Sequence, residues 1–406
     1  MRVTEFPEKN LKDYTDISDP KVLEEIEEIS KKLKGLRVVH VNATNFGGGV
    51  AELLYTIVPL MRSVGIDTRW EVIEAPSEFF NITKKLHNAL QGAKLKISDK
   101  EWKLYMKVNK ENSEKLELDA DIIVIHDPQP AAIPYLSNID SHLIWRCHID
   151  LSSPNKIVWN EFSRFLEPYE KMLFHTKEYF PEDFKEISIE FPPSIDPLSE
   201  KNFEMSKKEI LEVIKRFSIP NKPTLTVVAR FDPWKDLFSA IDVYRMVKKY
   251  SDIQLLIVSA MANDDPEGWI FFEKVLRYAG LDDDIKFLTN LIGVGSREVN
   301  AIQRYSTLGL HTAIKEGFGL VVSEMMWKGN PVVARPAGGV KMQIDDGENG
   351  FLRWDKEELV EAVMDLLKDK EKRTVFGIKG REKVRRKFLV TSHLLRYLKV
   401  FYELIL

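Results

Sequence analysis

The sequence predicts an α/β protein made of two Rossmann-like domains, each a doubly wound parallel sheet, that face across a cleft. Short apolar runs typical of buried strands alternate with amphipathic helical stretches along most of the chain. This alternation is typical of an open parallel sheet covered by helices on both faces. It breaks at residues 191–197, where three prolines exclude a central strand. Because 406 residues also exceed one ordinary core, we expect two domains, with ligands bound between them.

Composition narrows the class of protein. Hydrophobic residues make up 44% and charged residues 30% of the chain, as in a soluble globular protein. The chain has no apolar run of about 18 residues, and residues 1–16 lack the apolar core of a signal peptide, so we expect a cytoplasmic protein without a membrane helix. A single cysteine excludes an internal disulfide. The net charge of −4, without a dominant basic stripe, argues against nucleic-acid binding.

The first half of the chain contains five predicted strands, at residues 36–41, 68–73, 121–125, 142–146 and 171–174, and helices at 22–33 and 51–64. The charge-rich segment 77–116 predicts two more helices that project from the core. A glycine run at residues 47–49 separates the first strand from the second helix. This order is typical of a loop that approaches phosphate or sugar, although a merely tight connection has the same pattern.

Polar side chains follow the ends of several of these strands. They are Asn42 after the first strand, His126, Asp127 and Gln129 after the third, and His148 and Asp150 after the fourth. Ligands of open α/β sheets bind beyond these strand ends. A lone histidine there is more often structural than catalytic, and Asp150 could instead cap the next helix. The neighbouring Cys147 is expected to be a small buried hydrophobe.

The second half repeats the alternation. Strands are predicted at residues 224–230, 253–259, 285–288, 307–313, 331–334 and 351–353, and helices at 206–217, 237–250, 266–279, 297–305, 320–327 and 357–367. Apolar residues at helical spacing from Val384 to Ile405 predict one long terminal helix, which either forms a homodimer or crosses back onto the first domain. The expected domains are residues 1–200, residues 201–383 and the terminal helix 384–406.

A tight turn with two glycines, residues 315–319, precedes the helix at 320–327. Backbone amides in such a turn, together with the helix N-terminus, attract an anion. Two acids stand there, Glu316 in the turn and Glu324 in the helix, and carboxylates are strong acceptors for hydroxyl groups. The pattern therefore indicates a sugar nucleotide. In the alternative, Glu316 interacts with the helix dipole and Glu324 lies on an exposed face, although Glu324 has apolar neighbours.

Two cations, Arg230 and Lys235, follow the first strand of the second half. A departing nucleoside diphosphate gains negative charge, which an arginine and a lysine can stabilise in place of a metal ion. The pair could also be ordinary surface cations. The acidic run Asp282 to Asp284 lies in a polar turn and is expected to be solvated surface, so we predict no metal site and no required cofactor.

The run from Glu316 to Gly319, followed by Glu324, resembles the paired-glutamate signature of the retaining, nucleotide-sugar-dependent glycosyltransferases of family 4. Residues 316–334 and 145–152 resemble, within that family, the trehalose synthases. The resemblance extends over nearly the whole chain and is loose between residues 77 and 116. It implies the GT-B fold, a terminal helix that crosses back, and reversible transfer from NDP-glucose, such as UDP-glucose or ADP-glucose, to glucose, which yields trehalose.

The same resemblance assigns roles to individual residues. The catalytic group comprises Arg230 and Lys235 on the diphosphate, His148 beside the transferred sugar and Glu316 on its hydroxyls. Gly317, Phe318 and Gly319 join Glu316 on the donor sugar, and the nucleotide contacts Glu324, Asn290, Leu320, Val321 and Ser259. The acceptor contacts are Gly48, Gly49, Asp150 and Asn42.

Two departures from the wider family affect this assignment. Gln343 stands where a glutamate usually follows the glycines at 338–339, and Lys315 replaces a commoner arginine. Trehalose synthases share the departure at Gln343, whereas the one at Lys315 could alter the preferred base. Two other functions remain open from the sequence: a related glucosyltransferase whose acceptor is a sugar phosphate or a glucan, for which Lys94, Lys96 and Arg146 would be candidate cations, and a non-catalytic sugar-nucleotide-binding protein.

Overall fold

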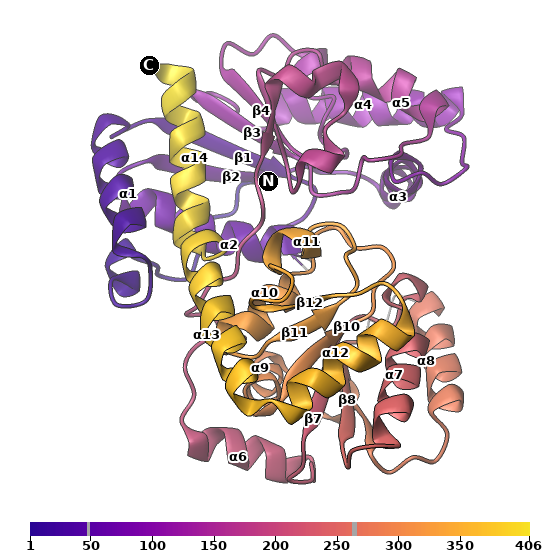
Figure 1. Cartoon of the computed structure of the whole chain (residues 1–406). Coiled ribbons are helices and arrows are strands. Elements are labelled where there is room, and N and C mark those ends of the chain that lie inside the picture. The colour runs from indigo at the N-terminus through magenta and orange to yellow at the C-terminus, as the bar shows by residue number, and fades with distance from the viewer. Residues whose placement is uncertain (47–48, 262–265) are drawn as a thin grey trace. The chain divides into compact units, whose positions relative to one another are not determined.

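The computed structural model describes residues 1–46, 49–261 and 266–406, which form two compact units (Figure 1). One unit comprises Met1–Pro193 together with Val390–Leu406, and the other comprises Ser194–Leu389. The chain therefore leaves the first unit inside the proline-rich segment 191–197 and returns to it at residue 390. The boundaries expected from the sequence lie at 200/201 and 383/384.

The first unit contains a six-stranded parallel sheet with strand order β2-β1-β3-β4-β5-β6. Its strands are β1 (Arg37–Asn42), β2 (Asp67–Val72), β3 (Ile122–His126), β4 (His142–Arg146), β5 (Lys171–Phe174) and β6 (Ser188–Glu190). Its helices are α1 (Pro20–Lys32), α2 (Gly49–Ser63), α3 (Ser77–Leu90), α4 (Asp99–Lys115), α5 (Lys156–Phe162) and α14 (Val390–Ile405). Side chains alternate across a strand, so Val39 and Val41 pack into the core cluster that includes α3 and α4, whereas His40 meets α14.

Helices α3 and α4 are part of this core, so the expectation that segment 77–116 projects from it is wrong. Leu86, Leu90 and Tyr105 are fully buried in the same cluster as Trp145 of β4. Ser98 caps α4, and Glu101 bonds back to the Ser98 amide. The charged residues of these helices lie on their outer faces, and the amphipathic pattern rather than the overall charge determined where they pack.

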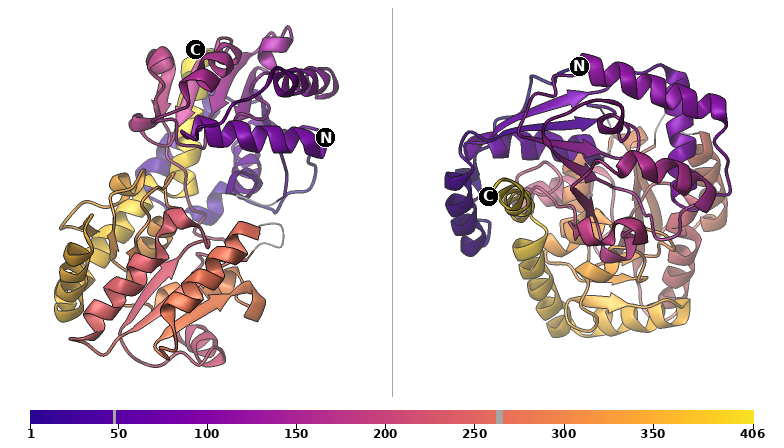
Figure 2. Two further views of the ribbon diagram at one scale, coloured as in Figure 1. Left: turned by 90° about the vertical axis from the view of Figure 1, so that its right-hand side faces the viewer. Right: turned by 90° about the horizontal axis from the view of Figure 1, so that it is seen from above.

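The second unit contains a second six-stranded parallel sheet, with strand order β12-β11-β10-β7-β8-β9. Its strands are β7 (Thr224–Val228), β8 (Gln254–Ser259), β9 (Ile285–Thr289), β10 (Leu308–His311), β11 (Val332–Ala334) and β12 (Gly350–Leu352). Its helices are α6 (Lys207–Arg216), α7 (Leu237–Lys248), α8 (Pro266–Ala279), α9 (Ser296–Tyr305), α10 (Leu320–Trp327), α11 (Val340–Gln343), α12 (Lys356–Lys368) and α13 (Lys370–Lys387). Figure 2 shows helices against both faces of this sheet. The predicted doubly wound α/β class is therefore confirmed for both units.

The predicted long terminal helix is in fact two helices, α13 and α14, which is a correction of the expected 384–406 element. Phe388 and Leu389 separate them, because the Phe388 carbonyl accepts a hydrogen bond from the Ile195 amide at 2.9 Å and Leu389 forms a β-bridge with Ile195. Helix α14 belongs to the first unit. There the Ser18 and Thr391 hydroxyls lie 2.8 Å apart, and the apolar face of α14 is buried.

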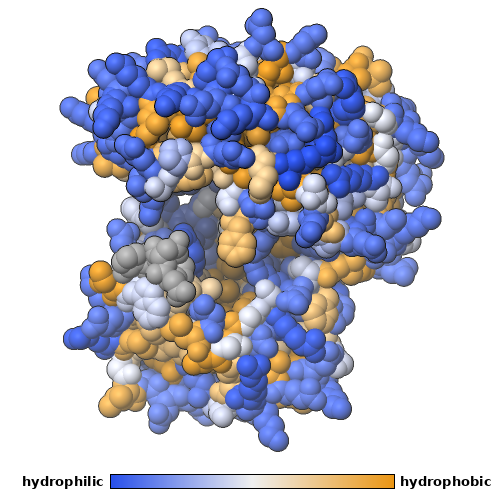
Figure 3. Space-filling view, turned by 180° about the vertical axis from the view of Figure 1, so that it is seen from behind, coloured by the Kyte–Doolittle hydropathy of each residue, from blue (hydrophilic) through white to orange (hydrophobic). Residues whose placement is uncertain are grey.

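Within the described residues no helix is long and apolar enough to cross a membrane. The face of the molecule in Figure 3 is mostly hydrophilic, with hydrophobic side chains interspersed.

Candidate active site

In the second unit, the predicted site residues follow the carboxyl ends of the strands. Arg230 and Lys235 follow β7, and Glu316 follows β10, the strand that pairs with β7. The two loops are joined: the Ile314 amide donates to the Trp234 carbonyl at 2.9 Å, and the Thr312 hydroxyl donates to the Lys235 carbonyl at 3.1 Å. The fold thus brings together three of the four residues expected to be catalytic.

The glycine turn and α10 have the geometry of an anion site. Gly319, at the N-cap of α10, has φ 79° and ψ 57°, a left-handed conformation that favours glycine. A Cβ there would also come within 3.1 Å of Val340 and 3.2 Å of Glu316. No side chain of the described residues caps this helix end. The Val322 amide donates to the Gly319 carbonyl at 2.9 Å, so the amides of Leu320 and Val321 are the ones left for a ligand in the first turn.

Glu316 is held as a carboxylate. Lys235 Nζ donates to Glu316 Oε2 at 2.6 Å, and His311 Nε2 lies 3.2 Å from the same oxygen. Burial alone would raise the pKa of Glu316, but the contacts with His311 and Lys235 outweigh it and lower the pKa to about 2. Lys235 and Glu316 thus neutralise each other, and a bound anion would compete with Glu316 for the ammonium group.

Arg230 is far less constrained than Lys235. Its side chain is 72% exposed, and its one ion pair with another described residue is a 3.4 Å contact with Asp232. The guanidinium is therefore able to reach a ligand. The alternative that both cations are ordinary surface residues is wrong for Lys235, whose side chain is only 16% exposed.

Glu324 is buried in α10, at 8% exposure, so the alternative of an exposed helix face is wrong. It forms no hydrogen bond or ion pair with the described residues, and its oxygens are not among the atoms sealed from solvent. Lys328, one turn later, donates to Asn202 Oδ1 at 2.8 Å, and burial lowers its pKa to about 7 while Glu324 opposes that shift. A carboxylate in this position is available to accept hydroxyl groups.

Gln343, the departure noted in the sequence, holds the turn and α10 together. Its Oε1 accepts from the Ser323 hydroxyl at 2.6 Å, and its Nε2 donates to the Phe318 carbonyl at 2.7 Å. An amide can do both, whereas a carboxylate cannot donate. In this protein the side chain at 343 is therefore occupied with supporting the site.

Sequence reasoning missed a second group of supporting residues. Asp236 has φ 44°, caps α7 and pairs with Arg335 at 2.6 Å, and Arg335 also donates to the Thr312 carbonyl at 2.8 Å. Together with His311, which contacts Glu316, these residues fix the loops after β7 and β10. The position of Asp236 directly before a helix was the available signal.

Two predicted nucleotide contacts at the ends of β8 and β9 differ in availability. The Asn290 amide is occupied, because it donates to the Met261 carbonyl at 2.9 Å and accepts from the Met261 amide at 2.7 Å. The Ser259 hydroxyl is buried and has no hydrogen-bond partner among the described residues. Leu320 and Val321 form the first turn of α10.

Two of the three acids at 282–284 form ion pairs, so the expectation of solvated surface holds for the exposed Asp283 but not for them. Asp282 pairs with Lys248 at 2.7 Å, and Asp284 pairs with Lys222 at 2.5 Å. In the part of the chain that the structure describes, no group of three or more acidic, histidine or cysteine side chains is arranged to hold a metal ion.

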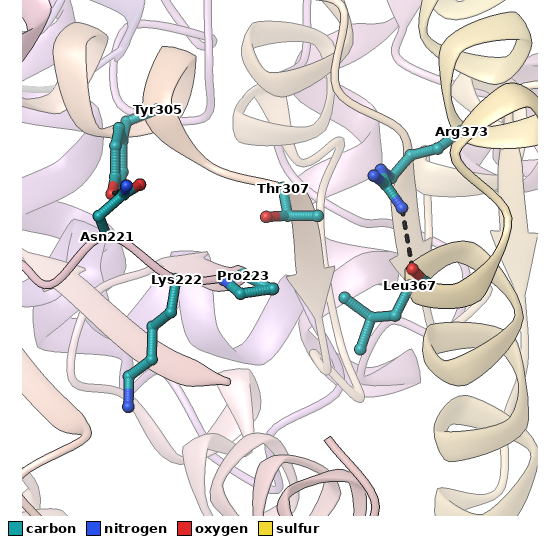
Figure 4. A pocket seen from close by; sticks show the side chains of 7 residues that line it. All are labelled: Asn221, Lys222, Pro223, Tyr305, Thr307, Leu367 and Arg373. Carbon is teal, nitrogen blue, oxygen red and sulfur yellow. Dashed lines mark hydrogen bonds between the residues drawn. The ribbon is translucent and has the colours of Figure 1, made fainter. Parts of the chain in front are cut away.

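A small hollow elsewhere in the second unit is not part of this site. Its lining residues are Asn221, Lys222, Pro223, Tyr305, Thr307, Leu367 and Arg373 (Figure 4). Five of these residues precede β7 or β10, and Leu367 and Arg373 belong to α12 and α13. The hollow therefore lies at the amino ends of these strands, whereas ligands of such sheets bind at the carboxyl ends.

In the first unit, the predicted acceptor contacts are partly occupied. Asn42 accepts from Trp70 Nε1 at 2.8 Å and donates to the Thr44 carbonyl at 2.7 Å. Asp150 accepts from the Ser152 amide at 2.8 Å. It does not cap α5, because Asn155 does. Gly49 begins α2, and Gly48 lies outside the described residues.

His148 is not a lone histidine. Its Nε2 lies 3.0 Å from His126 Nδ1, and His126 Nε2 lies 3.0 Å from His40 Nδ1. The His148 amide donates to Asp127 Oδ1 at 2.8 Å, and Asp127 adopts a left-handed conformation with φ 64°. Burial raises the pKa of Asp127 to about 7. Cys147 is buried, as predicted.

Arg146 ends β4 and is fully buried, with its guanidinium 5.0 Å from the centre of the Phe191 ring. None of its three nitrogens has a hydrogen-bond partner among the described residues. Burial lowers its pKa to about 10, so it remains charged at neutral pH. It therefore places a positive charge beside the histidines and does not extend to the surface.

Comparisons with known proteins agree with this arrangement. A family model described as "Trehalose synthase, N-terminal domain" matches residues 40–181, and one described as "Glycosyl transferases group 1" matches residues 210–383. The chain is similar to a trehalose synthase of Pyrococcus horikoshii (52% identical, covering 98% of this chain and 97% of the relative) and to one of Rubrobacter xylanophilus (41% identical, 98% and 97%). The crystal structure of a UDP-forming α,α-trehalose-phosphate synthase from Burkholderia vietnamiensis has a TM-score of 0.71 at 15% identity, covering 91% of this chain and 98% of that one. Such structural neighbours show the GT-B fold.

Proposed function

Because the chain belongs to the trehalose synthase family of GT-B glycosyltransferases, we propose that it is a retaining glucosyltransferase that makes trehalose, reversibly, from NDP-glucose and glucose. The proposed donor is UDP-glucose, ADP-glucose or a related nucleotide sugar, and the proposed location is the cytoplasm.

The observation that carries the proposal is the arrangement around α10. It combines an ionised Glu316, a helix end that no described side chain caps, and a buried Glu324 that bonds to no described residue. We assign Glu316 and the amides of Gly317, Phe318 and Gly319 to the donor sugar and its phosphate. We assign Glu324 to the ribose hydroxyls. An anion alone would not require carboxylates here, whereas a sugar nucleotide uses both the amides and the acids.

The proposed reaction is a front-face displacement. The bond between C1 of glucose and the β-phosphate oxygen breaks, and a bond from the acceptor hydroxyl oxygen to C1 forms on the same face. The hydroxyl proton passes to the departing diphosphate. Arg230 and Lys235 would stabilise the negative charge that the diphosphate gains, and His148 would contact the transferred sugar. Positioning and charge stabilisation of this kind can supply most of the rate enhancement.

The cation clamp is proposed to act in place of a metal ion, and a chelator tests this directly. Activity should survive EDTA. Complete loss of activity with recovery on addition of magnesium would contradict the role given to Arg230 and Lys235.

The function itself is tested by product analysis. The protein is incubated with UDP-, ADP- or GDP-glucose and free glucose, with glucose 6-phosphate and a glucan as alternative acceptors, and the Glu316→Gln variant is the matched control. The expected product is trehalose together with the free nucleoside diphosphate, and the variant should form much less. A product formed only with glucose 6-phosphate or glucan would reassign the acceptor, and nucleotide binding without any transfer would indicate a binding protein.

A further inference from the structure

Three histidines form a row across adjacent strands of the first sheet. His40 lies in β1, His126 ends β3 and His148 follows β4, and these strands are neighbours in the sheet. Consecutive rings are joined by Nδ1···Nε2 contacts of 3.0 Å, and their centres lie 5.3 Å apart in both pairs. Since two of the three are fully buried, this histidine row connects the interior of the sheet with the partly exposed His148.

Such a row can carry its protons in only two ways. A neutral imidazole has one N–H donor and one acceptor nitrogen, so each of the two contacts needs one hydrogen. Either every ring is protonated on Nδ1, which leaves the Nδ1–H of His148 pointing outward, or every ring is protonated on Nε2, which leaves the Nε2–H of His40 at the buried end. A single ring cannot change tautomer without the other two.

The surroundings keep the row neutral. Burial lowers the pKa of each ring, to about 3 for His40, and the charge of Arg146 lowers the pKa of His126 and His148 further. The other titratable and charged groups beside the row are Asp127 after β3, His175 after β5, and His393, Arg396 and Tyr397 of α14. The positively charged groups near the row, Arg146 and Arg396, oppose protonation of the imidazoles.

The buried end of the row decides between the two arrangements. His40 Nε2 is sealed from solvent and has no hydrogen-bond partner among the described residues. A buried N–H without an acceptor is rarer and more costly than an acceptor with an unused lone pair. The nearby Tyr397 ring, 5.6 Å away between centres, would be a poor substitute for an acceptor. The arrangement with a bare Nε2 on His40 is therefore favoured.

The open end of the row then presents a donor. His148 Nδ1 makes no hydrogen bond to the described residues and is not among the atoms sealed from solvent. We propose that His40 and His126 are positioning residues that fix His148 as its Nδ1–H tautomer, so that His148 acts as a neutral hydrogen-bond donor to a sugar oxygen and not as a general base. The sugar as recipient rests on the proposed function, whereas the tautomer does not.

The tautomer is measurable without activity. In protein labelled with ¹⁵N-histidine, proton–nitrogen correlation spectra distinguish Nδ1–H, Nε2–H and imidazolium, and the His148 signals are identified by their loss in His148→Gln. We expect Nδ1–H for His148, unchanged between about pH 6 and pH 8, where an ordinary histidine titrates. An Nε2–H or an imidazolium at His148 would overturn the proposal, whether or not the protein makes trehalose.

Two nearly isosteric substitutions at position 40 test which nitrogen of each ring in the row carries the hydrogen. Asparagine can present either an amide donor or a carbonyl acceptor where His40 has Nδ1, whereas an ionised aspartate presents only an acceptor there. His40→Asn should keep the Nδ1–H form of His148 and keep turnover within about threefold, while His40→Asp should reverse His148 to Nε2–H and lower turnover about tenfold or more. Nucleotide affinity should be unchanged in both, because the proposed nucleotide contacts lie in the second unit.

His142→Asn is the matched control for these variants. His142 begins β4, but it is only half-buried and pairs with Glu170 at 3.0 Å, outside the row. It should alter neither the His148 spectrum nor turnover. If His40→Asp lowers turnover while His148 keeps Nδ1–H, the effect is structural and the positioning role is wrong. If His40→Asp does not fold, the wild-type and His40→Asn spectra still decide the tautomer.

Discussion

The contact between Lys235 and Glu316 allows the most quantitative prediction. The pKa of Glu316 falls from an ordinary value of 4.5 to about 2 in the folded protein. That difference corresponds to about 3 kcal/mol of stabilisation at neutral pH. His311 supplies part of it, so Lys235→Met should lower the free energy of unfolding by about 1–3 kcal/mol, because a nearly buried carboxylate loses its cation.

The reverse change should cost less. Glu316→Gln leaves Lys235 with a flexible stem that can carry its ammonium group to solvent, whereas Glu316 cannot follow. The double variant should recover most of the stability lost in Lys235→Met, since no unpaired buried carboxylate remains. Denaturant unfolding at neutral pH measures all four proteins, and Lys249→Met, a change at an exposed lysine, is the control for loss of a positive charge.

The pH dependence identifies the responsible group. A carboxyl group with a lowered pKa stabilises the fold fully above its unfolded pKa, near 4.5, and loses this contribution as the pH falls toward 2. The stability difference between wild type and Lys235→Met should therefore shrink below about pH 4.5. A difference that stays constant there would show that the Glu316 charge is not its source. Equal unfolding of wild type and both single variants would refute the ion pair itself.

Three further predictions concern single side chains. Arg230→Ala should lower turnover by about 10² or more while leaving the free energy of unfolding unchanged, since the side chain is 72% exposed; a wild-type rate would remove Arg230 from the site. Glu324→Ala should weaken nucleotide binding in calorimetry, because the proposed acceptor for the ribose hydroxyls is lost; wild-type affinity would exclude the ribose contact. Because the folded pKa of Asp127 is raised to about 7, the protein should lose stability as the pH rises from about 4 to 7, and Asp127→Asn, which tolerates the left-handed backbone, should remove that slope; an unchanged slope would assign it elsewhere.

Much of the fold could be predicted because its elements have strong local patterns. The predicted bounds of β4, β5, α8 and α10 coincide with those in the structure. The three-residue edge strand β6 was missed, since it is too short to show a period and is only half-buried. The break between α13 and α14 was missed for a different reason. Apolar residues continue at helical spacing through it, and only the pairing of Leu389 with Ile195, distant in the sequence, reveals where the helix ends.

The site shows a similar limit. A sequence motif can identify which residue types gather at a strand end. Here it correctly predicted that Lys235 and Glu316 lie close together. The motif cannot show which polar atoms already form hydrogen bonds within the protein. Asn42 and Asn290 bond to nearby protein groups through both the oxygen and the nitrogen of their amides, whereas Glu324 bonds to none of the residues that the structure describes. That difference arises from tertiary contacts, and it separates residues that support the site from residues that remain available to a ligand.

The two units prepare their polar groups in opposite ways. In the second unit, Lys235 and His311 overcome the effect of burial, and Glu316 stays ionised. In the first unit, burial and the Arg146 charge act in the same direction, and the histidine row stays neutral. Both groups are thereby held in one protonation state across the neutral range. Positioning and charge stabilisation require such a fixed state, whereas proton transfer through His148 or Glu316 would require a group that changes its protonation state. The proposed front-face displacement, in which the departing diphosphate takes the acceptor proton, needs nothing more from these side chains and no protein base at either position.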